Sequence, residues 1–250
     1  MTKKRLDQSV AQLGLTETRS QAESYIKLGK VSVNGKIVTK PGFYVAPTST
    51  ITLEDEDRYV SRAGLKLASV ARALGLSFQD AVVLDVGSST GGFTDFALQH
   101  GASKVFAVDV GTEQLHPSLR GNQRVELHEK TDIREFIPSQ TPSIIVIDVS
   151  FISLREVLPY LASAIAGPHT QIVAMVKPQF EAGKGQTNSG VIKNDSVRRT
   201  ILKDFELWAK DLFLIKDKQD SEVAGAKGNR ERFYLLTLKR NSTTSPGRIT

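Results

Sequence analysis

The sequence contains no cysteine in its 250 residues. This absence excludes disulfides, thiolate metal sites and a cysteine nucleophile. The four histidines are scattered without the spacing of metal ligands, so we expect no metal site. No apolar run approaches the length of a membrane helix, and residues 1–5 lead into a polar stretch without the apolar core of a signal peptide. We therefore expect a cytoplasmic protein that does not insert into membranes.

Acidic residues are scarce at the N-terminus, where the positive charge of the chain is concentrated. The formal net charge is +6, and residues 1–53 hold eight basic residues against three acidic ones. The rest of the chain is close to neutral. A basic module attached to a neutral body predicts contact with the phosphate backbone of a nucleic acid. The alternative is a solvated cationic face that only aids solubility.

Residues 1–54 are expected to form a small α+β unit. Apolar residues at helical spacing predict a helix over Leu6–Leu13. A second helix is expected to begin near Ser20, because Ser20 and Glu23 have the S-x-x-E pattern of a capping box. Alternating residues around an Asn-Gly pair predict a hairpin over residues 31–38.

An acidic run at residues 54–57 separates this unit from the rest of the chain. We expect a linker at 55–60, a second domain at 61–240 and a flexible tail at 241–250. From Ser61 onward, helical and strand patterns alternate as in an α/β doubly wound sheet. A helix is expected over Gly64–Leu74. The seven expected strands are residues 82–86, 104–108, 125–128, 144–147, 171–176, 212–216 and 233–239.

A strand that runs into a glycine-rich turn is the most informative feature of the second domain. Residues 82–94 read VVLDVGSSTGGFT, with Asp85 near the strand end. The glycine spacing matches neither the dinucleotide fingerprint nor a P-loop, and it resembles the first motif of S-adenosylmethionine methyltransferases. A second strand ends at Asp109, where such folds bind ribose hydroxyls. We expect a nucleotide-like pocket here, the alternative being two aspartates that merely cap strand ends.

Four ionisable side chains are expected at the same edge of the sheet. Residues 148–151 read DVSF and lack the Asn/Asp-Pro-Pro-Tyr signature of base-nitrogen methylation. The carboxyl ends of parallel strands meet at one edge, which should gather Lys66, Asp148, Lys177 and Glu231. Such a set suits methyl transfer to a sugar hydroxyl, in which a lysine accepts the hydroxyl proton. A lysine with an ordinary pKa of about 10.4 is protonated at neutral pH, so burial and nearby positive charge would have to tune it.

The N-terminal unit resembles the S4 RNA-binding domain. The similarity lies in residues 19–22 (RSQA), 26–35 (IKLGKVSVNG) and 40–41 (KP). The resemblance implies that the two helices and the hairpin face structured RNA. Its implied RNA-binding residues are Arg5, Arg19, Lys27, Lys30, Lys36 and Arg62.

Over residues 5–239 the chain resembles the TlyA family, hemolysin-A-like ribosomal RNA 2′-O-methyltransferases that join an S4 domain to an FtsJ-type domain. The similarity is carried by SRAGLKL at 61–67, DVGSSTGGFT at 85–94, DVSFIS at 148–153, VKPQFE at 176–181 and GNRE at 228–231. It implies a Rossmann-like seven-stranded methyltransferase domain behind a small S4 domain. In the linker, mycobacterial members carry tryptophan where this chain has Tyr59, which leaves a coupling between linker and cofactor open.

The resemblance further implies an activity and its residues. The expected reaction is S-adenosylmethionine-dependent methylation of ribose in ribosomal RNA, at cytidine, with ribosomal RNA or ribosomal subunits as partner. Lys177 would be the central residue of a catalytic tetrad with Lys66, Asp148 and Glu231. The implied cofactor-binding residues are Asp85, Gly87, Ser88, Ser89, Thr90, Gly91, Gly92, Phe93, Thr94, Asp109, Val110, Asp132 and Ile133. For Asp132, a helix-capping role is the alternative.

Two other functions are weighed against this one. The first is a non-catalytic RNA-binding factor for ribosome assembly, against which the intact glycine turn and the tetrad argue. The second is a membrane-lytic protein, as the family's hemolysin name suggests. The sequence lacks the long amphipathic or apolar segment that lysis requires.

Overall fold

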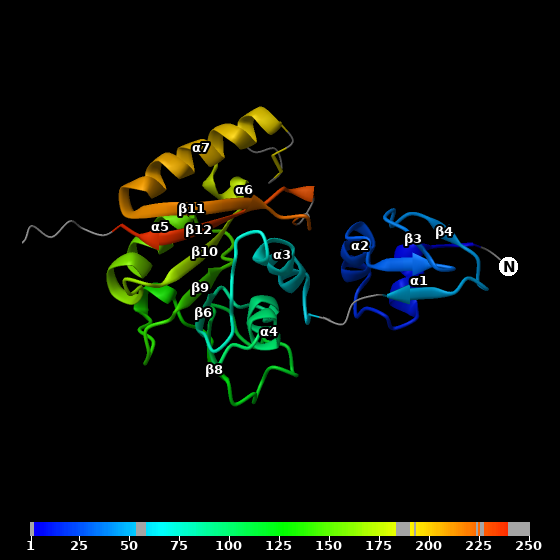
Figure 1. Cartoon of the computed structure of the whole chain (residues 1–250), viewed down its shortest axis with the longest axis horizontal. Helices are drawn as coiled ribbons and strands as arrows, with labels where there is room; N and C mark the ends of the chain where they lie inside the picture. The colour runs from blue at the N-terminus through cyan, green and yellow to red at the C-terminus, as the bar shows by residue number, and fades with distance from the viewer. Residues whose placement is uncertain are drawn as a thin grey trace, which may run out of the picture.

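The computed structural model describes residues 3–53, 59–183, 191–192, 194–223, 225 and 228–239. Figure 1 shows a small N-terminal body beside a larger α/β body. Most of the expected linker and the whole expected tail lie outside the described residues. None of the described helices is long and apolar enough to cross a membrane.

The N-terminal body packs two helices against short antiparallel strands. Its elements are β1 (Lys4–Arg5), α1 (Leu6–Gln12), α2 (Arg19–Lys27), β2 (Val31–Val33), β3 (Lys36–Ile37), β4 (Tyr44–Val45) and β5 (Ile51–Leu53). The strands form a β3-β2-β5 sheet and a β1-β4 pair. Asn34 and Gly35 both have positive φ, as the expected hairpin turn requires. Leu6, Val10 and Ile26 are fully buried and form part of the core.

The start of α2 differs from the expected capping box. Thr18 is the N-cap, and its side chain accepts from the backbone N–H of Gln21. The Gln21 side-chain oxygen in turn accepts from the backbone N–H of Thr18 at 3.2 Å. Ser20 therefore lies inside the helix, where its hydroxyl accepts from Arg62 Nη1 at 2.9 Å. The sequence contains two overlapping capping patterns, Thr18 with Gln21 and Ser20 with Glu23. The prediction of a cap at Ser20 was wrong, because the helix begins earlier, at Arg19.

The larger body is built on a seven-stranded mixed sheet with the order β11-β12-β10-β9-β6-β7-β8. Its strands are β6 (Val82–Val86), β7 (Lys104–Val108), β8 (Val125–His128), β9 (Ile144–Ile147), β10 (Gln171–Val176), β11 (Phe213–Asp220) and β12 (Arg232–Leu238). The first five have the expected bounds. The expected strand 212–216 instead extends to Asp220, because antiparallel pairing with β12 continues to the pair Asp220–Arg232.

Helices cover both faces of this sheet, as Figure 1 shows for α3, α4, α5 and α7. The helical elements are α3 (Arg62–Ala71), α4 (Gly92–Gln99), a 3₁₀ turn (Ile133–Glu135), α5 (Leu154–Tyr160), a π-helical turn (Leu161–Ile165), α6 (Pro178–Glu181) and α7 (Asp195–Leu212). Alternate residues of the central strand enter separate cores: Val83 packs on one side, and Leu84 and Val86 on the other. Burial on both faces explains the continuous apolar runs of the parallel strands.

The two bodies contact each other around Tyr59 and Arg62. The Gln21 side chain donates to the Tyr59 carbonyl at 3.2 Å, and Arg62 Nε donates to the Ser24 hydroxyl at 3.2 Å. The Tyr59 ring is buried and lies 5.5 Å from the ring of Phe96 in α4. These contacts join α2 of the N-terminal body to the helical layer of the larger one.

Candidate active site

The strand order brings five ionisable side chains to one edge of the sheet. Glu231 directly precedes β12, Lys177 follows β10, Asp148 follows β9, Asp85 lies in β6, and Asp109 follows β7. These strands are neighbours in the order β12-β10-β9-β6-β7. Because β12 is antiparallel to β10, its beginning lies beside the end of β10, and the two chains are in register there.

The four residues of the expected tetrad form two ion pairs. Lys66 Nζ in α3 lies 2.6 Å from Glu231 Oε2. Lys177 Nζ lies 2.6 Å from Asp148 Oδ1. Both lysines and Glu231 are buried. The positive charges are thus matched by carboxylates, as buried charges require.

Lys177 has one more polar partner that sequence reasoning missed. Its Nζ donates to the Ser150 hydroxyl at 2.6 Å. Ser150 is exposed and also lines the adjoining cleft. The quoted DVSF segment contained this serine, but its spacing alone does not reveal which side chain it contacts.

The glycine turn after β6 has the left-handed backbone that glycine favours. Gly87 and Gly91 have φ of 81° and 93°. A Cβ at Gly87 would lie 2.9 Å from the carbonyl oxygen of Asp148. A Cβ at Gly91 would lie 2.5 Å from Leu119 and 2.7 Å from Leu115. The left-handed backbone therefore favours glycine at both positions, and the approach of the Asp148 backbone adds to this at Gly87.

Asp109 ties this turn to the end of β7. Its carboxylate accepts from the backbone N–H of Ser89 at 2.8 Å and from that of Gly111 at 2.6 Å. Asp132 caps the 3₁₀ turn, accepting from the Arg134 backbone N–H at 2.9 Å. Hydrogen bonds from Arg134 also hold the pKa of Asp132 below its usual range. The capping role of Asp132 is therefore real, and Asp132 also lines the cleft.

Asp85 is fully buried beneath the turn. Burial raises its pKa to about 7, and the nearby carboxylates of Asp148 and Asp109 add to this, while hydrogen bonds from Thr94 oppose it. The Thr94 hydroxyl donates to Oδ2 at 2.7 Å. Oδ1 has no hydrogen-bond partner among the described residues, and the same is true of the buried Ser88 hydroxyl. Two unsatisfied buried polar atoms indicate a place for polar groups of a ligand.

A cleft of about 440 Å³ opens beside the turn. Six of the expected cofactor residues line it: Gly87, Ser89, Asp109, Val110, Asp132 and Ile133. An adjoining hollow of about 80 Å³ is lined by Asp85, Ser88, Thr90 and Phe93, among others. Gly91, Gly92 and Thr94 line neither of these spaces. Carboxylates beside apolar residues in the cleft, and unsatisfied polar atoms in the hollow, fit a nucleoside linked to an amino-acid group.

An exposed aromatic residue lies at the mouth of the cleft. Phe151 is 93% exposed and has a φ of 66°, which is uncommon for a bulky residue. Its ring lies 5.3 Å from that of Phe180. Composition and periodicity contained no signal for this placement.

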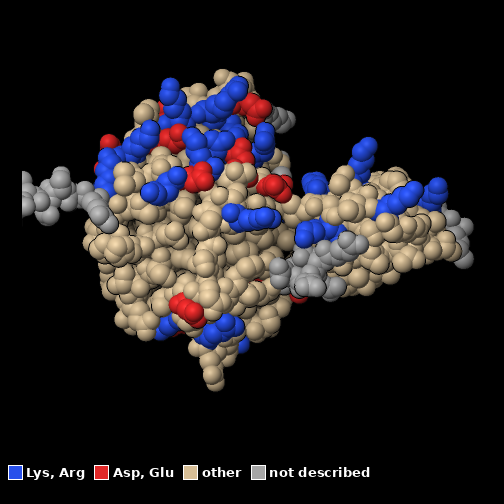
Figure 2. Space-filling model, viewed as in Figure 1, with Lys and Arg blue, Asp and Glu red and all other residues tan. Residues whose placement is uncertain are grey.

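The expected RNA-binding residues differ in their surroundings. Arg5 and Arg19 both donate to the buried carboxylate of Asp7. Although burial opposes it, these bonds lower the pKa of Asp7 to about 2. Arg62 donates hydrogen bonds to the hydroxyl groups of Ser20 and Ser24 in α2. Lys27, Lys30 and Lys36 are exposed, and Figure 2 shows basic side chains along the N-terminal body.

Among the described residues, no group of three or more His, Asp or Glu side chains is arranged to hold a metal ion.

Comparison with known proteins relates both bodies to characterised families. The S4 domain model matches residues 4–51, and the FtsJ-like methyltransferase model matches residues 59–239. The chain is 39% identical to the 16S/23S rRNA (cytidine-2′-O)-methyltransferase TlyA of Mycobacterium tuberculosis, covering 96% of this chain and 92% of that protein. It is 40% identical to Hemolysin A of Brachyspira hyodysenteriae, covering 91% and 97%.

A solved structure gives the same relationship in three dimensions. A protein from Streptococcus thermophilus, described provisionally as a hemolysin, superposes with a TM-score of 0.71 at 40% identity, covering 96% of this chain and 90% of that one. The expected Rossmann-like seven-stranded fold behind an S4 domain is confirmed. The chain belongs to the FtsJ-like methyltransferase family and carries an S4 domain before its methyltransferase domain.

Proposed function

We propose that the protein transfers a methyl group from S-adenosylmethionine to a ribose 2′-hydroxyl of ribosomal RNA. The observation that carries this proposal is the ion pair between the buried Lys177 and Asp148, which lines the cleft at the sheet edge. The names of relatives that match most of the chain support the ribosomal RNA substrate and cytidine as the target. The S4 domain supports an RNA partner.

The cleft residues suit the parts of this cofactor. Asp109 would accept hydrogen bonds from its ribose hydroxyls. Val110 and Ile133 would contact the adenine, with Asp132 near it. Asp85 and Ser88 would take the amino-acid group in the smaller hollow. When bound, S-adenosylmethionine supplies an electrophilic methyl group.

Lys177 is the residue proposed to act on the ribose. Its neutral amine would accept the 2′-hydroxyl proton at Nζ as the ribose oxygen forms its bond to the methyl carbon and the bond between that carbon and the cofactor sulfur breaks, with S-adenosylhomocysteine as the leaving group. Asp148 and Ser150 would hold Nζ in place, and alignment of the hydroxyl would provide much of the rate. The Lys66–Glu231 pair would lie beside Lys177, because Glu231 directly precedes β12, Lys177 directly follows β10, and Val176 pairs with Arg232 there.

The N-terminal domain would supply RNA affinity. Its proposed contacts are Arg5, Arg19, Lys27, Lys30 and Lys36, with Arg62 at the domain junction. We place the division of the chain at 1–54, 55–60, 61–240 and 241–250. A ribosomal RNA substrate would require the protein to be in the cytoplasm.

The test is methylation of ribosomal subunits from a strain that lacks this gene. Purified protein and labelled S-adenosylmethionine should transfer label to ribose 2′-oxygens, which nuclease digestion and mass spectrometry would map. Lys177→Ala protein is the control. RNA binding without any methyl transfer would instead support the assembly-factor function, and vesicle leakage would support the lytic one.

A further inference from the structure

The Glu231 side chain is held in place by contacts with other parts of the chain. It is 2% exposed and directly precedes β12, and the two residues before it, Asn229 and Arg230, belong to no helix or strand. Its backbone carbonyl accepts from the Ser221 N–H at 3.0 Å. A Cβ at Gly225 would collide with Glu231 Oε1, so the carboxylate is closely packed on that side. Its ion-pair partner, Lys66, comes from α3.

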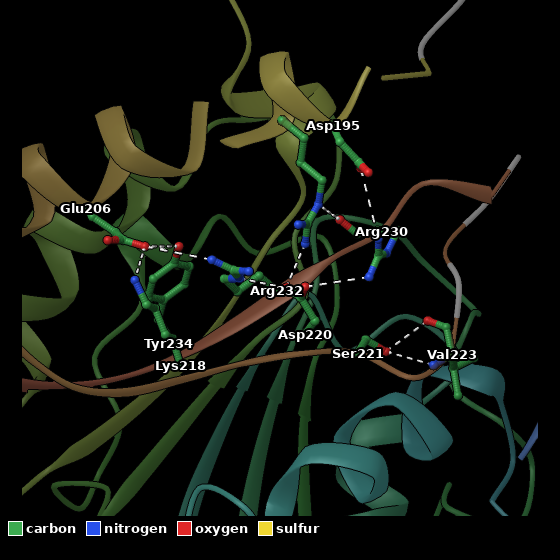
Figure 3. A network of polar contacts seen from close by, with 10 residues as sticks. Asp195, Glu206, Lys218, Asp220, Ser221, Val223, Arg230, Arg232 and Tyr234 are labelled. Atoms are coloured by element: carbon green, nitrogen blue, oxygen red, sulfur yellow. Dashed lines mark hydrogen bonds and ion pairs between the residues drawn. The ribbon is translucent and has the colours of Figure 1, made fainter. Parts of the chain in front are cut away.

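The residues on both sides of Glu231 are held by a charged network from α7 and β11. Arg198 Nε donates to the carbonyl of Arg230 at 3.0 Å, and Arg198 Nη2 donates to Asp220 Oδ1 at 2.7 Å. Arg232 Nε donates to the same Asp220 oxygen at 2.6 Å. Figure 3 shows Asp220 between Arg230 and Arg232, with Asp195 beyond Arg230.

Glu206 of α7 provides a second carboxylate in this network, in addition to Asp220. Glu206 Oε1 accepts from Lys218 Nζ at 2.7 Å and from the Tyr234 hydroxyl at 2.9 Å. It also lies 4.0 Å from Arg232 Nη1. Arg232 is thus bound between two carboxylates, and the beginning of β12 is tied to α7 through both of them (Figure 3).

Arg198 is the most buried charged side chain of this network, at 6% exposed. A buried guanidinium is tolerated when its donors are matched, and its planar shape fixes the direction of each bond. Burial of Asp220 works against its ionised form, but hydrogen bonds from Arg232 and Arg198 outweigh burial and lower its pKa. The network is therefore charged at neutral pH and directional at each contact.

We propose that Arg198 and Asp220 are positioning residues for Glu231. By holding residues 230 and 232, they keep the carboxylate between them opposite Lys66 Nζ. This inference rests on the proposed function, in which the Lys66–Glu231 pair acts on Lys177. Neither Arg198 nor Asp220 lines the cleft, so both would act on the rate through Glu231 and leave ligand binding unchanged.

The first test replaces Arg198 with lysine. Arg198→Lys keeps the charge, but an ammonium group on a flexible stem cannot reproduce the two fixed bonds to the Arg230 carbonyl and Asp220. We expect kcat to fall about 10- to 100-fold, as for a small misplacement of a reacting group. The KM for ribosomal subunits and the calorimetric Kd for S-adenosylmethionine should stay within about twofold. Arg199→Lys, at an exposed neighbouring position on α7, should leave kcat unchanged.

The second test separates positioning from a general structural effect. In a Glu231→Gln background, Arg198→Lys should lower kcat by less than about twofold more, because the group through which it acts has been altered. If the double variant's loss of kcat equals the product of the losses in the two single variants, the inference is overturned. An unchanged kcat for Arg198→Lys would also overturn it. If Arg198→Lys fails to fold, as judged by its melting curve, Asp220→Asn replaces it in the same cycle. An unchanged kcat for Glu231→Gln would overturn the role of the tetrad itself, and the inference with it.

Discussion

Replacing the buried Asp85 by asparagine should stabilise the protein and weaken its cofactor site at the same time. In the folded chain its pKa is about 7, against an ordinary value of 3.8, with burial as the main cause. Asparagine has nearly the same shape, and its side-chain oxygen can still accept from the Thr94 hydroxyl. The substitution therefore removes an ionisation that the folded protein opposes.

The sign and size of the effect follow from proton linkage. Between pH 4 and 7 the folded protein keeps the Asp85 proton that the unfolded chain has lost, so its stability falls as pH rises. Above about pH 7 both states are ionised and the penalty is constant. Each pKa unit corresponds to about 1.4 kcal/mol, so a shift of about three units costs about 4 kcal/mol at pH 8. Between pH 5 and pH 8, the stability gained from Asp85→Asn should grow by about 3 kcal/mol.

Urea unfolding at pH 5 and pH 8 would measure this difference. The single tryptophan, Trp208 in α7, reports on the methyltransferase domain through its fluorescence. Asp204→Asn, which removes an exposed carboxylate from the same helix, controls for the loss of one negative charge. If the wild type and Asp85→Asn show parallel pH dependence, the burial argument for Asp85 is wrong.

The same substitution should weaken cofactor binding. Asp85 lines the small hollow in which we place the amino-acid group of S-adenosylmethionine. An ionised carboxylate there would pair with the ammonium group, and asparagine would not. At pH 8 we therefore expect Asp85→Asn to be more stable than the wild type but to bind S-adenosylmethionine more weakly by calorimetry. Unchanged affinity for S-adenosylmethionine would contradict the placement of its ammonium group in this hollow.

Three further outcomes are expected. Lys177→Ala and Lys177→Arg should each lower the rate of single-turnover methylation at least about 100-fold while cofactor affinity is retained. Alanine removes the base, and the guanidinium of arginine cannot be deprotonated. Near-normal transfer by either variant would mean that Lys177 has only a structural role. Ser150→Ala should lower kcat about tenfold and Ser150→Thr much less, because the Ser150 hydroxyl holds Lys177 Nζ in place through a hydrogen bond, and such a bond is worth about 0.5–1.5 kcal/mol. Equal rates for the two variants would contradict the contact with Lys177. Lys27→Gln and Lys36→Gln should weaken binding to ribosomal RNA and each reduce the slope of log K against log salt by about 1, as measured by filter binding; an unchanged slope would place these lysines away from the RNA.

Much of the fold was readable from local pattern. The strands over 82–86, 104–108, 125–128, 144–147 and 171–176 were predicted with the observed bounds, because fully buried parallel strands are continuous apolar runs between turn residues. The Asn34–Gly35 turn was equally clear, since its positive φ values restrict the residues that can occupy it. The glycine turn and the strand-end carboxylates pointed to the edge at which the cleft was found.

Other features depended on contacts between distant segments. The true cap of α2 was decided by where that helix begins, and the length of β11 by its pairing with β12. The division of the tetrad into a Lys66–Glu231 pair and a Lys177–Asp148 pair followed from the antiparallel entry of β12 beside β10, which no local pattern encodes.

The sequence by itself determined the kinds of element, their order and the residues at their ends, because those depend on periodicity and on the backbone preferences of a few residues. Only the tertiary structure decided which charges meet, how deeply Asp85 is buried and what supports Glu231. The physical reason is that pairing and burial depend on strand register and helix packing, which bring together residues far apart in the chain. Electrostatic strength in turn depends on how far those contacts exclude water.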